Sequence, residues 1–180
     1  MSYTPSLPEV TCAAAIAELG HITSMKYMRL VNLDLDRISA SDLASLAQGN
    51  NFDTVWINKV IGNLVPILQN IKCKQLHISN MSTADVCVVN MNVNDTQSLV
   101  SAMSKGVQEL MLGGDVTLHM ETLATYHGEG VCGRITFSDD VRRKYGPQVE
   151  LWAQKMGWDL KVLYSHYIAI EKNQSNDLRG

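Results

Sequence analysis

The residues best suited to chemistry lie in one short stretch, where His119, His127 and Cys132 follow one another. A cysteine acts as a nucleophile when a nearby base deprotonates it and donors stabilise the oxyanion that forms. The glycine-rich segment "HGEGVCG" would give such a thiol a flexible loop. Spacing identifies no Asn or Asp that would orient a histidine, so we predict that the protein is not an enzyme and has no catalytic residues.

Motifs for cofactors and metals are absent from the sequence. There is no GxxxxGK[ST] phosphate loop, and no GxGxxG follows a predicted strand, so no nucleotide site is predicted. The histidines form no HxH or HxxxH pair. The four cysteines are Cys12, Cys73, Cys87 and Cys132, and no two form a CxxC pair. We expect no cofactor, no metal site, and reduced thiols with structural roles.

The overall charge argues against a nucleic-acid partner. The chain has 15 Lys and Arg against 18 Asp and Glu, which gives a formal net charge of −3 and a pI near 5.9. Phosphate binding needs clustered basic side chains, and we interpret the most compact run, Arg142-Arg143-Lys144, as a solvated helix start. The longest apolar stretch, "CAAAIA", is too short to cross a bilayer. We expect a cytoplasmic protein with neither a nucleic-acid nor a membrane partner.

The elements that would position a site follow from a change of spacing in "MRLVNLDLDRISASDLASLA". Met28 and Leu30 alternate as on one face of a strand, whereas Ile38, Leu43 and Leu46 recur as on one face of a helix. The segment therefore predicts a strand, a turn and a helix.

This unit recurs along the chain, which is typical of a solenoid. Successive pairs of inward strand residues are separated by steps of 27, 21, 10, 24, 25 and 25 residues. The pairs are Met28/Leu30, Val55/Ile57, Leu76/Ile78, Val86/Val88, Leu110/Leu112, Ile135/Phe137 and Leu160/Val162. Several strands are followed by a residue suited to a sharp turn, namely Asn32, Asn58, Asn80, Asn90 and Gly113.

Helical stretches follow most of these strands. They are "DLASLAQG", "NLVPILQNIK", "DTQSLVSAMSKG", "METLATYHGEG" and "PQVELWAQKMG", with Pro66 and Pro147 expected early in their helices. The step of 10 residues breaks this pattern, because "SNMSTADVCVVNMNVND" leaves no room for a helix between two strands. We favour a repeat without a helix there, and one repeat with an inserted excursion is the alternative.

The segments "MRLVNLDLDRISASDLASLAQG" and "VQELMLGGDVTLHMETLATYHG" resemble leucine-rich repeats of the ribonuclease-inhibitor type. The resemblance covers about residues 27–162 and departs from the family in its irregular steps. Segments such as "LVNLDL" and "WAQKMGW" also resemble the leucine-rich portions of invertebrate-chordate innate-immunity receptors that combine a nucleotide-binding domain with such repeats. The resemblance implies an α/β solenoid, a short and irregular horseshoe arc with parallel concave strands and convex helices.

We predict a single leucine-rich-repeat domain over residues 1–172. An N-terminal capping helix is expected within residues 6–24, because Ser6 and Glu9 are spaced as a capping box and Gly20 suits the helix end. The repeats are expected over about residues 25–158 and a C-terminal cap over about residues 148–172, with a flexible tail at 173–180.

Function in such a scaffold is expected on strand residues that point away from the helices, because side chains alternate between the faces of a strand. The predicted ligand-binding residues are Arg29, Val31, Trp56, Asn58, His77, Ser79, Cys87, Val89, Glu109, Met111, Arg134 and Thr136, with Lys161 beyond them. Trp, His and Arg side chains carry much of the binding energy at protein interfaces. For Trp56 the alternative is packing against a neighbouring repeat, and for His77 it is a surface histidine without a ligand.

We therefore expect a non-catalytic module that binds a protein or another macromolecule through its concave face. The resemblance implies a role in innate immunity or cell-death signalling. The alternative is a structural scaffold or self-association domain of a larger receptor, for which a homodimer is one form, and an enzyme is a more distant third hypothesis.

Overall fold

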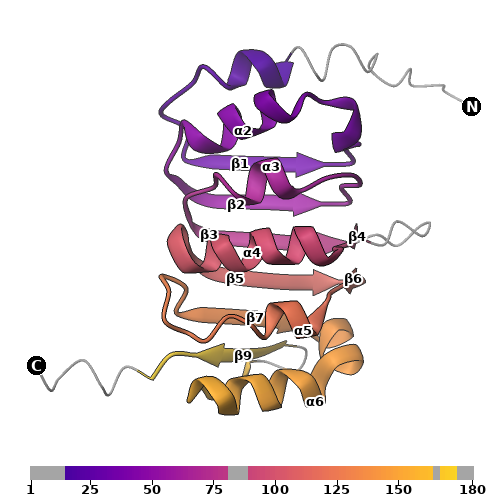
Figure 1. The fold of residues 1–180 in the computed structure, drawn as a ribbon, viewed down its shortest axis with the longest axis vertical. Helices are drawn as coiled ribbons and strands as arrows, with labels where there is room; N and C mark the ends of the chain where they lie inside the picture. Colours follow the sequence, from indigo (N-terminus) through magenta and orange to yellow (C-terminus); the bar gives the residue numbers. More distant parts are fainter. Residues whose placement is uncertain (1–14, 81–88, 164–166, 174–180) are drawn as a thin grey trace, which may run out of the picture.

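The computed structural model describes residues 15–80, 89–163 and 167–173, and within them seven strands form one mostly parallel sheet (Figure 1). In spatial order the strands are β1 (Tyr27–Val31), β2 (Phe52–Asn58), β3 (Cys73–Asn80), β5 (Val107–Gly114), β7 (Arg134–Ser138), β9 (Tyr167–Glu171) and β8 (Asp159–Leu163). The first five are parallel and follow the order of the sequence, whereas β9 and β8 pair antiparallel. The α/β class with a parallel sheet is confirmed.

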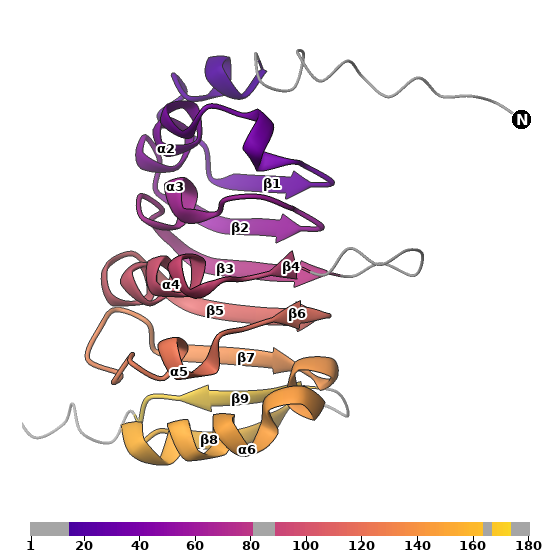
Figure 2. The ribbon, with the colours of Figure 1, turned by 45° about the vertical axis from the view of Figure 1, so that its right-hand side comes forward.

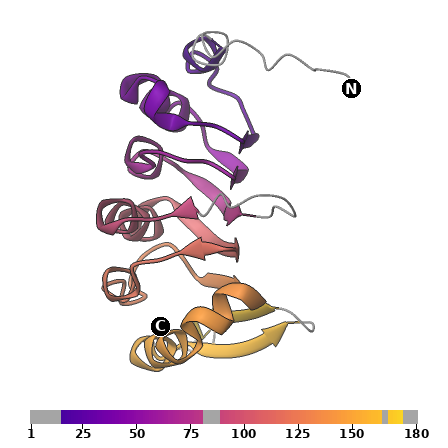
Figure 3. The ribbon, with the colours of Figure 1, turned by 90° about the vertical axis from the view of Figure 1, so that its right-hand side faces the viewer.

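The helices line one face of this sheet, as Figures 2 and 3 show. They are the 3-10 turn η1 (Leu35–Arg37), α2 (Ala40–Gln48), α3 (Val65–Leu68), α4 (Val93–Lys105), α5 (Met120–Leu123) and α6 (Asp139–Met156). We call the opposite side of the sheet the helix-free face. Two short strands, β4 (Val89–Asn90) and β6 (Val116–Thr117), form a separate parallel pair.

The core lies between the sheet and the helices, and the predicted inward pairs build it. Five pairs are buried, namely Met28/Leu30, Val55/Ile57, Leu76/Ile78, Leu110/Leu112 and Ile135/Phe137. The register places each pair beside the next, so these side chains form two continuous apolar rows across the strands. The prediction of these inward positions is confirmed.

The predicted repeat without a helix is wrong. Strand β3 pairs directly with β5 through a register that runs from Cys73↔Val107 to Asn80↔Gly114, which leaves no place for a strand between them. The following residues form β4, which pairs with β6, and then α4, whose capping box joins Asn92 to Asp95. The connection from β3 to β5 therefore contains β4 and α4 and adds no strand to the main sheet, while Val86 and Val88 lie outside the described residues.

The C-terminal strands also depart from the prediction. Strand β9 lies between β7 and β8, so β8 is the edge of the sheet. Leu160 and Val162 share the row of inward residues but are 44% and 67% exposed, because no strand follows them to complete the core. The expectation that this pair is buried is wrong.

Helix α6 is longer than its predicted stretch. It begins after Ser138, whose hydroxyl accepts a 3.5 Å hydrogen bond from the Val141 N–H, and it continues through Pro147. Pro147 is therefore inside the helix and not at its start, whereas Pro66 does lie in the first turn of α3. The basic run predicted to be a solvated helix start is exposed within the first turns of α6.

At the N-terminal end residues 15–19 are helical, and the Gly20 N–H donates to the Ile16 carbonyl at 3.0 Å. Gly20 thus lies at the helix end, as expected, while the predicted capping box of Ser6 and Glu9 and the tail from residue 174 lie outside the described residues. None of the helices described is both long enough and apolar enough to span a membrane.

Candidate functional site

The parallel register brings five of the predicted binding residues into one row on the sheet. Arg29 on β1 lies beside Trp56 on β2, which lies beside His77 on β3, and the row continues to Met111 and Thr136 on β5 and β7. These residues alternate with the buried inward pairs, so the row belongs to the helix-free face (Figure 2). Adjacent members of the row are separated by up to 34 positions in the chain, as His77 and Met111 are.

The first three members of this row form a stack, which we call the Arg-Trp-His stack. The rings of Trp56 and His77 are almost parallel, with an interplanar angle of 9° and centroids 4.6 Å apart. The Arg29 guanidinium carbon lies 5.7 Å from the centre of the Trp56 ring, within the range of a cation–π contact. Trp56 packs against its neighbouring strands and is still 40% exposed, so the stack presents an aromatic surface to solvent.

A small hollow of about 240 Å³ adjoins the stack at His77. Two polar side chains of its lining bind each other, since the Gln75 amide donates to the Glu109 carboxylate at 3.2 Å. The Arg134 Nε lies 3.0 Å from the Glu171 carboxylate, an ion pair without the alignment of a hydrogen bond. The lining consists of Gln75, His77, Glu109, Leu110, Met111, Arg134, Thr136, Leu163 and Tyr167. The lining thus combines charged, amide, aromatic and apolar side chains.

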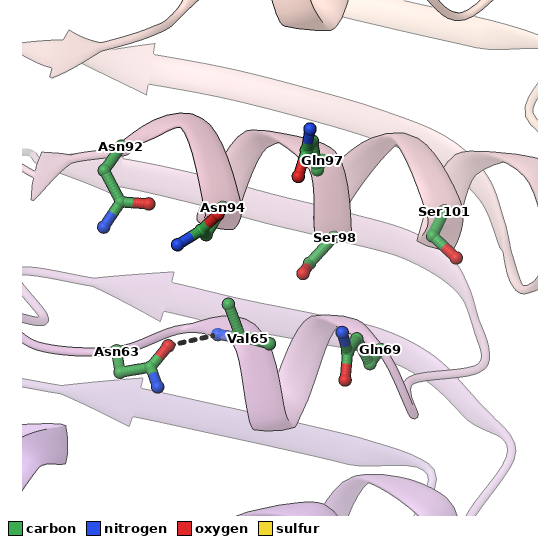
Figure 4. A pocket seen from close by; sticks show the side chains of 8 residues that line it. All are labelled: Asn63, Val65, Gln69, Asn92, Asn94, Gln97, Ser98 and Ser101. Atoms are coloured by element: carbon green, nitrogen blue, oxygen red, sulfur yellow. Dashed lines mark hydrogen bonds between the residues drawn. The ribbon is translucent and has the colours of Figure 1, made fainter.

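A second hollow, of about 540 Å³, lies on the opposite side of the molecule between α3 and α4 (Figure 4). The Asn63 side chain accepts from the Val65 N–H at 3.0 Å, and the remaining polar groups are also uncharged. The lining is Asn63, Val65, Gln69, Asn92, Asn94, Gln97, Ser98 and Ser101. Because the lining offers no acid, base or cation, this hollow gives no support for catalysis. Sequence reasoning missed it, since amides on two separate helices leave no motif.

The cysteine and histidines with catalytic potential do not form a catalytic site. Cys132 is fully buried, burial raises the pKa of its thiol to about 12, and the thiol bonds to the Arg134 carbonyl at 3.4 Å. His119 instead caps α5, where its Nδ1 lies 2.7 Å from the Thr122 hydroxyl. His127 is exposed. Among the described residues no group of three or more His, Cys, Asp or Glu could hold a metal ion.

No family model, curated protein or solved structure matches this chain. The fold and the Arg-Trp-His stack are therefore the observations on which a function can be based.

The other predicted binding residues are divided between accessible and inaccessible positions. Val31 and Asn58 are half-buried on the helix-free face. Ser79 and Thr136 are each only 8% exposed, which corrects their prediction as open contact residues. Their short side chains are recessed between neighbouring strands, and Thr136 forms part of the lining of the hollow beside His77.

Three further residues of the predicted surface lie elsewhere. Val89 is in β4 and so does not belong to the main sheet, which corrects its assignment to the binding face. Cys87 lies outside the described residues. Lys161 is exposed on the edge strand β8 and pairs with the Glu171 carboxylate.

The environment of His77 makes the stack sensitive to pH. Partial burial lowers the pKa of His77 below its usual 6.5, and the nearby Glu109 carboxylate opposes this shift. An additional proton on the ring would lie in the same row as the Arg29 guanidinium, with Trp56 between them. His77 is therefore neutral in the stacked state at neutral pH.

We predict that His77 titrates with a midpoint below 6.5 in the folded protein. Since the unfolded chain takes up this proton first, the contribution of His77 to stability is present above pH 6.5 and is lost as the pH falls through the folded pKa. The measurement is an NMR titration of the His77 ring, with unfolding followed across the same pH range in wild type and His77→Gln. A midpoint at or above 6.5 would contradict the burial of this ring.

Proposed function

We propose that the chain is a short leucine-rich-repeat solenoid of the ribonuclease-inhibitor type, and that its helix-free face is the concave binding surface. Parallel strands in sequence order and helices on one side of the sheet support this proposal. Turn residues at strand ends add to it, since Asn32 and Gly114 have φ angles of 56° and 61°. Residues 15–172 then form one repeat domain with terminal caps.

The module binds a protein partner, and the observation that carries this proposal is the Arg-Trp-His stack. Trp and Arg are enriched among residues whose loss costs a protein interface most of its affinity. Here they lie together on rigid strands, with the indole exposed and its neighbours already in place, so little side-chain freedom is lost on binding. By resemblance to the receptor repeats, the partner belongs to cytoplasmic innate-immunity or cell-death signalling.

A second candidate function is self-association, as in a scaffold or a part of a larger receptor. The exposed apolar residues Leu160 and Val162 on the edge strand β8 favour it, because an open strand edge can pair with a strand of another molecule. This surface is separate from the stack, so the two candidates respond to different substitutions.

The test is to capture partners from a native extract with the wild-type protein, identify them by mass spectrometry, and measure their affinity as purified proteins. Trp56→Ala should weaken binding of a genuine partner at least tenfold, since it removes the exposed ring at the centre of the stack. Leu151→Ala is the matched control, because Leu151 is an exposed apolar residue of α6.

Light scattering on the purified protein separates the two candidates. A monomer whose partner is lost with Trp56→Ala supports recognition by the helix-free face. A dimer that Val162→Lys converts to a monomer, with no partner sensitive to Trp56, supports self-association. Equal binding by wild type and Trp56→Ala would contradict the role of the stack.

A further inference from the structure

A positively charged surface lies at the edge of the sheet where the parallel strands begin, although the chain as a whole is negatively charged. A groove of about 380 Å³ is lined there by four lysines, Lys26, Lys72, Lys74 and Lys105, which we call the lysine groove. The rest of its lining is Asn51, Phe52, Asp53, Cys73, Gly106, Gln108 and Val131. Four cations around one groove stand out in a chain with a net charge of −3.

The fold brings these lysines together from distant parts of the sequence. Lys26 directly precedes β1, and Lys72 directly precedes β3. Lys74 is the second residue of β3, and Lys105 is the last residue of α4. Since parallel strands all begin at the same edge of a sheet, the segments that lead into β1, β2, β3 and β5 converge there. Backbone hydrogen bonds join these segments at the starts of the strands. The Phe52 N–H, for example, donates to the Lys72 carbonyl at 2.9 Å.

Most of the positive charge in the lysine groove is uncompensated. Asp53 is its one acidic lining residue, and the Lys74 ammonium lies 2.7 Å from its carboxylate. This hydrogen bond lowers the pKa of Asp53, with a smaller contribution from Lys26. Among the described residues Lys72 and Lys105 have no ion pair, and all four lysines are exposed. The groove therefore attracts anions.

We propose that the lysine groove binds an acidic segment of a polypeptide. The lysines line the groove from three separate segments of the chain, which suits several separate carboxylates better than one compact anion. The Asn51 and Gln108 amides in the lining can hydrogen-bond to a peptide backbone. This inference is independent of the proposed function, because it involves none of the residues of the Arg-Trp-His stack.

A nucleic acid fits the lysine groove less well than an acidic peptide does. Stacking platforms for nucleic-acid bases are missing, since Phe52, the aromatic residue of the lining, is buried. The lining holds no arginine, and its lysines are point charges that can bind phosphate or carboxylate, so inorganic phosphate is one of the probes in the test.

The experiment measures binding of a fluorescently labelled oligo-glutamate peptide by anisotropy at low and physiological salt. The test variant is Lys72→Gln with Lys105→Gln, which spares the Lys74–Asp53 pair. The matched control is Arg142→Gln with Lys155→Gln on α6, which removes the same charge and, like Lys105, includes a lysine in a last helical turn.

We expect wild type to bind the peptide more weakly as salt rises, and the test variant to bind about fivefold more weakly than wild type at low salt. The control should bind as wild type does. Absence of binding at low salt, or an equal loss in test and control variants, would overturn the proposal. Tighter binding of a single-stranded oligonucleotide or of inorganic phosphate through the same two lysines would overturn its assignment to an acidic peptide.

Discussion

Replacing Trp152 with alanine should lower the free energy of unfolding by about 3–5 kcal/mol, the usual cost of removing a large aromatic side chain from a core. Trp152 lies on α6 and is only 1% exposed. Its indole N–H also donates to the Tyr126 carbonyl at 2.8 Å, which ties α6 to the segment after α5. The substitution therefore leaves a cavity and an unpaired buried carbonyl at once. Chemical denaturation followed by far-UV circular dichroism measures the loss.

Two further variants separate the contributions of volume and hydrogen bonding. Trp152→Phe keeps most of the volume but loses the donor and part of the buried ring, so it should cost about 1–2 kcal/mol. Trp56→Ala is the control for removing a tryptophan from a half-exposed site, and it should cost about 1–2 kcal/mol, less than Trp152→Ala, because it loses the stacking and cation–π contacts but leaves no core cavity. A loss at residue 152 no larger than that at residue 56 would show that α6 does not close the core.

The sequence was sufficient to predict the inward face of the sheet. Pairs such as Val55/Ile57 and Leu110/Leu112 have apolar residues at alternate positions, and only one side of each strand can face the helices. The same alternation predicts that Arg29, Trp56 and His77 share the other face. Their stacking follows from the register, which pairs residues 29, 56 and 77, and one strand considered alone contains no such information.

The alternation of apolar residues gave wrong predictions where the outcome depended on which strands pair with each other. Around residues 86–90 an apolar alternation predicted another strand of the main sheet, but β3 and β5 bond to each other directly. At the C-terminus Leu160 and Val162 have the pattern of a buried pair, yet β9 occupies the place beside β7. Alternation identifies which residues share a face, whereas the order of strands decides which of those residues are covered.

The lysine groove shows a related limit. The four lysines lie in three separate segments, at Lys26, at Lys72 and Lys74, and at Lys105, so a search for basic runs along the chain passes over them. The run that such a search does find, Arg142 to Lys144, lies on an exposed helix turn, where Arg143 pairs with Asp139. Such a cluster forms because segments distant in the sequence lead into neighbouring parallel strands at the same edge of the sheet.

Replacing Gly114 with alanine should lower the free energy of unfolding by about 3 kcal/mol. Gly114 ends β5 with a φ of +61°, a conformation that costs an L-residue about 1–2 kcal/mol. An added Cβ would also lie 2.2 Å from the Asn80 carbonyl oxygen, and backbone cannot move aside as a flexible side chain can. Asn80 is the register partner of Gly114, so relief of the clash would separate the ends of β3 and β5.

Gly133→Ala is the matched control, because the segment leading into β7 leaves nothing within 4 Å of a Cβ at that position, and its φ is not left-handed. That variant should be neutral or stabilise the protein by up to about 1 kcal/mol, since alanine restricts the unfolded chain more than glycine does. Denaturation of both variants side by side gives the comparison. Equal stability would mean that β3 and β5 do not approach this closely at their ends, where Asn80 and Gly114 are paired.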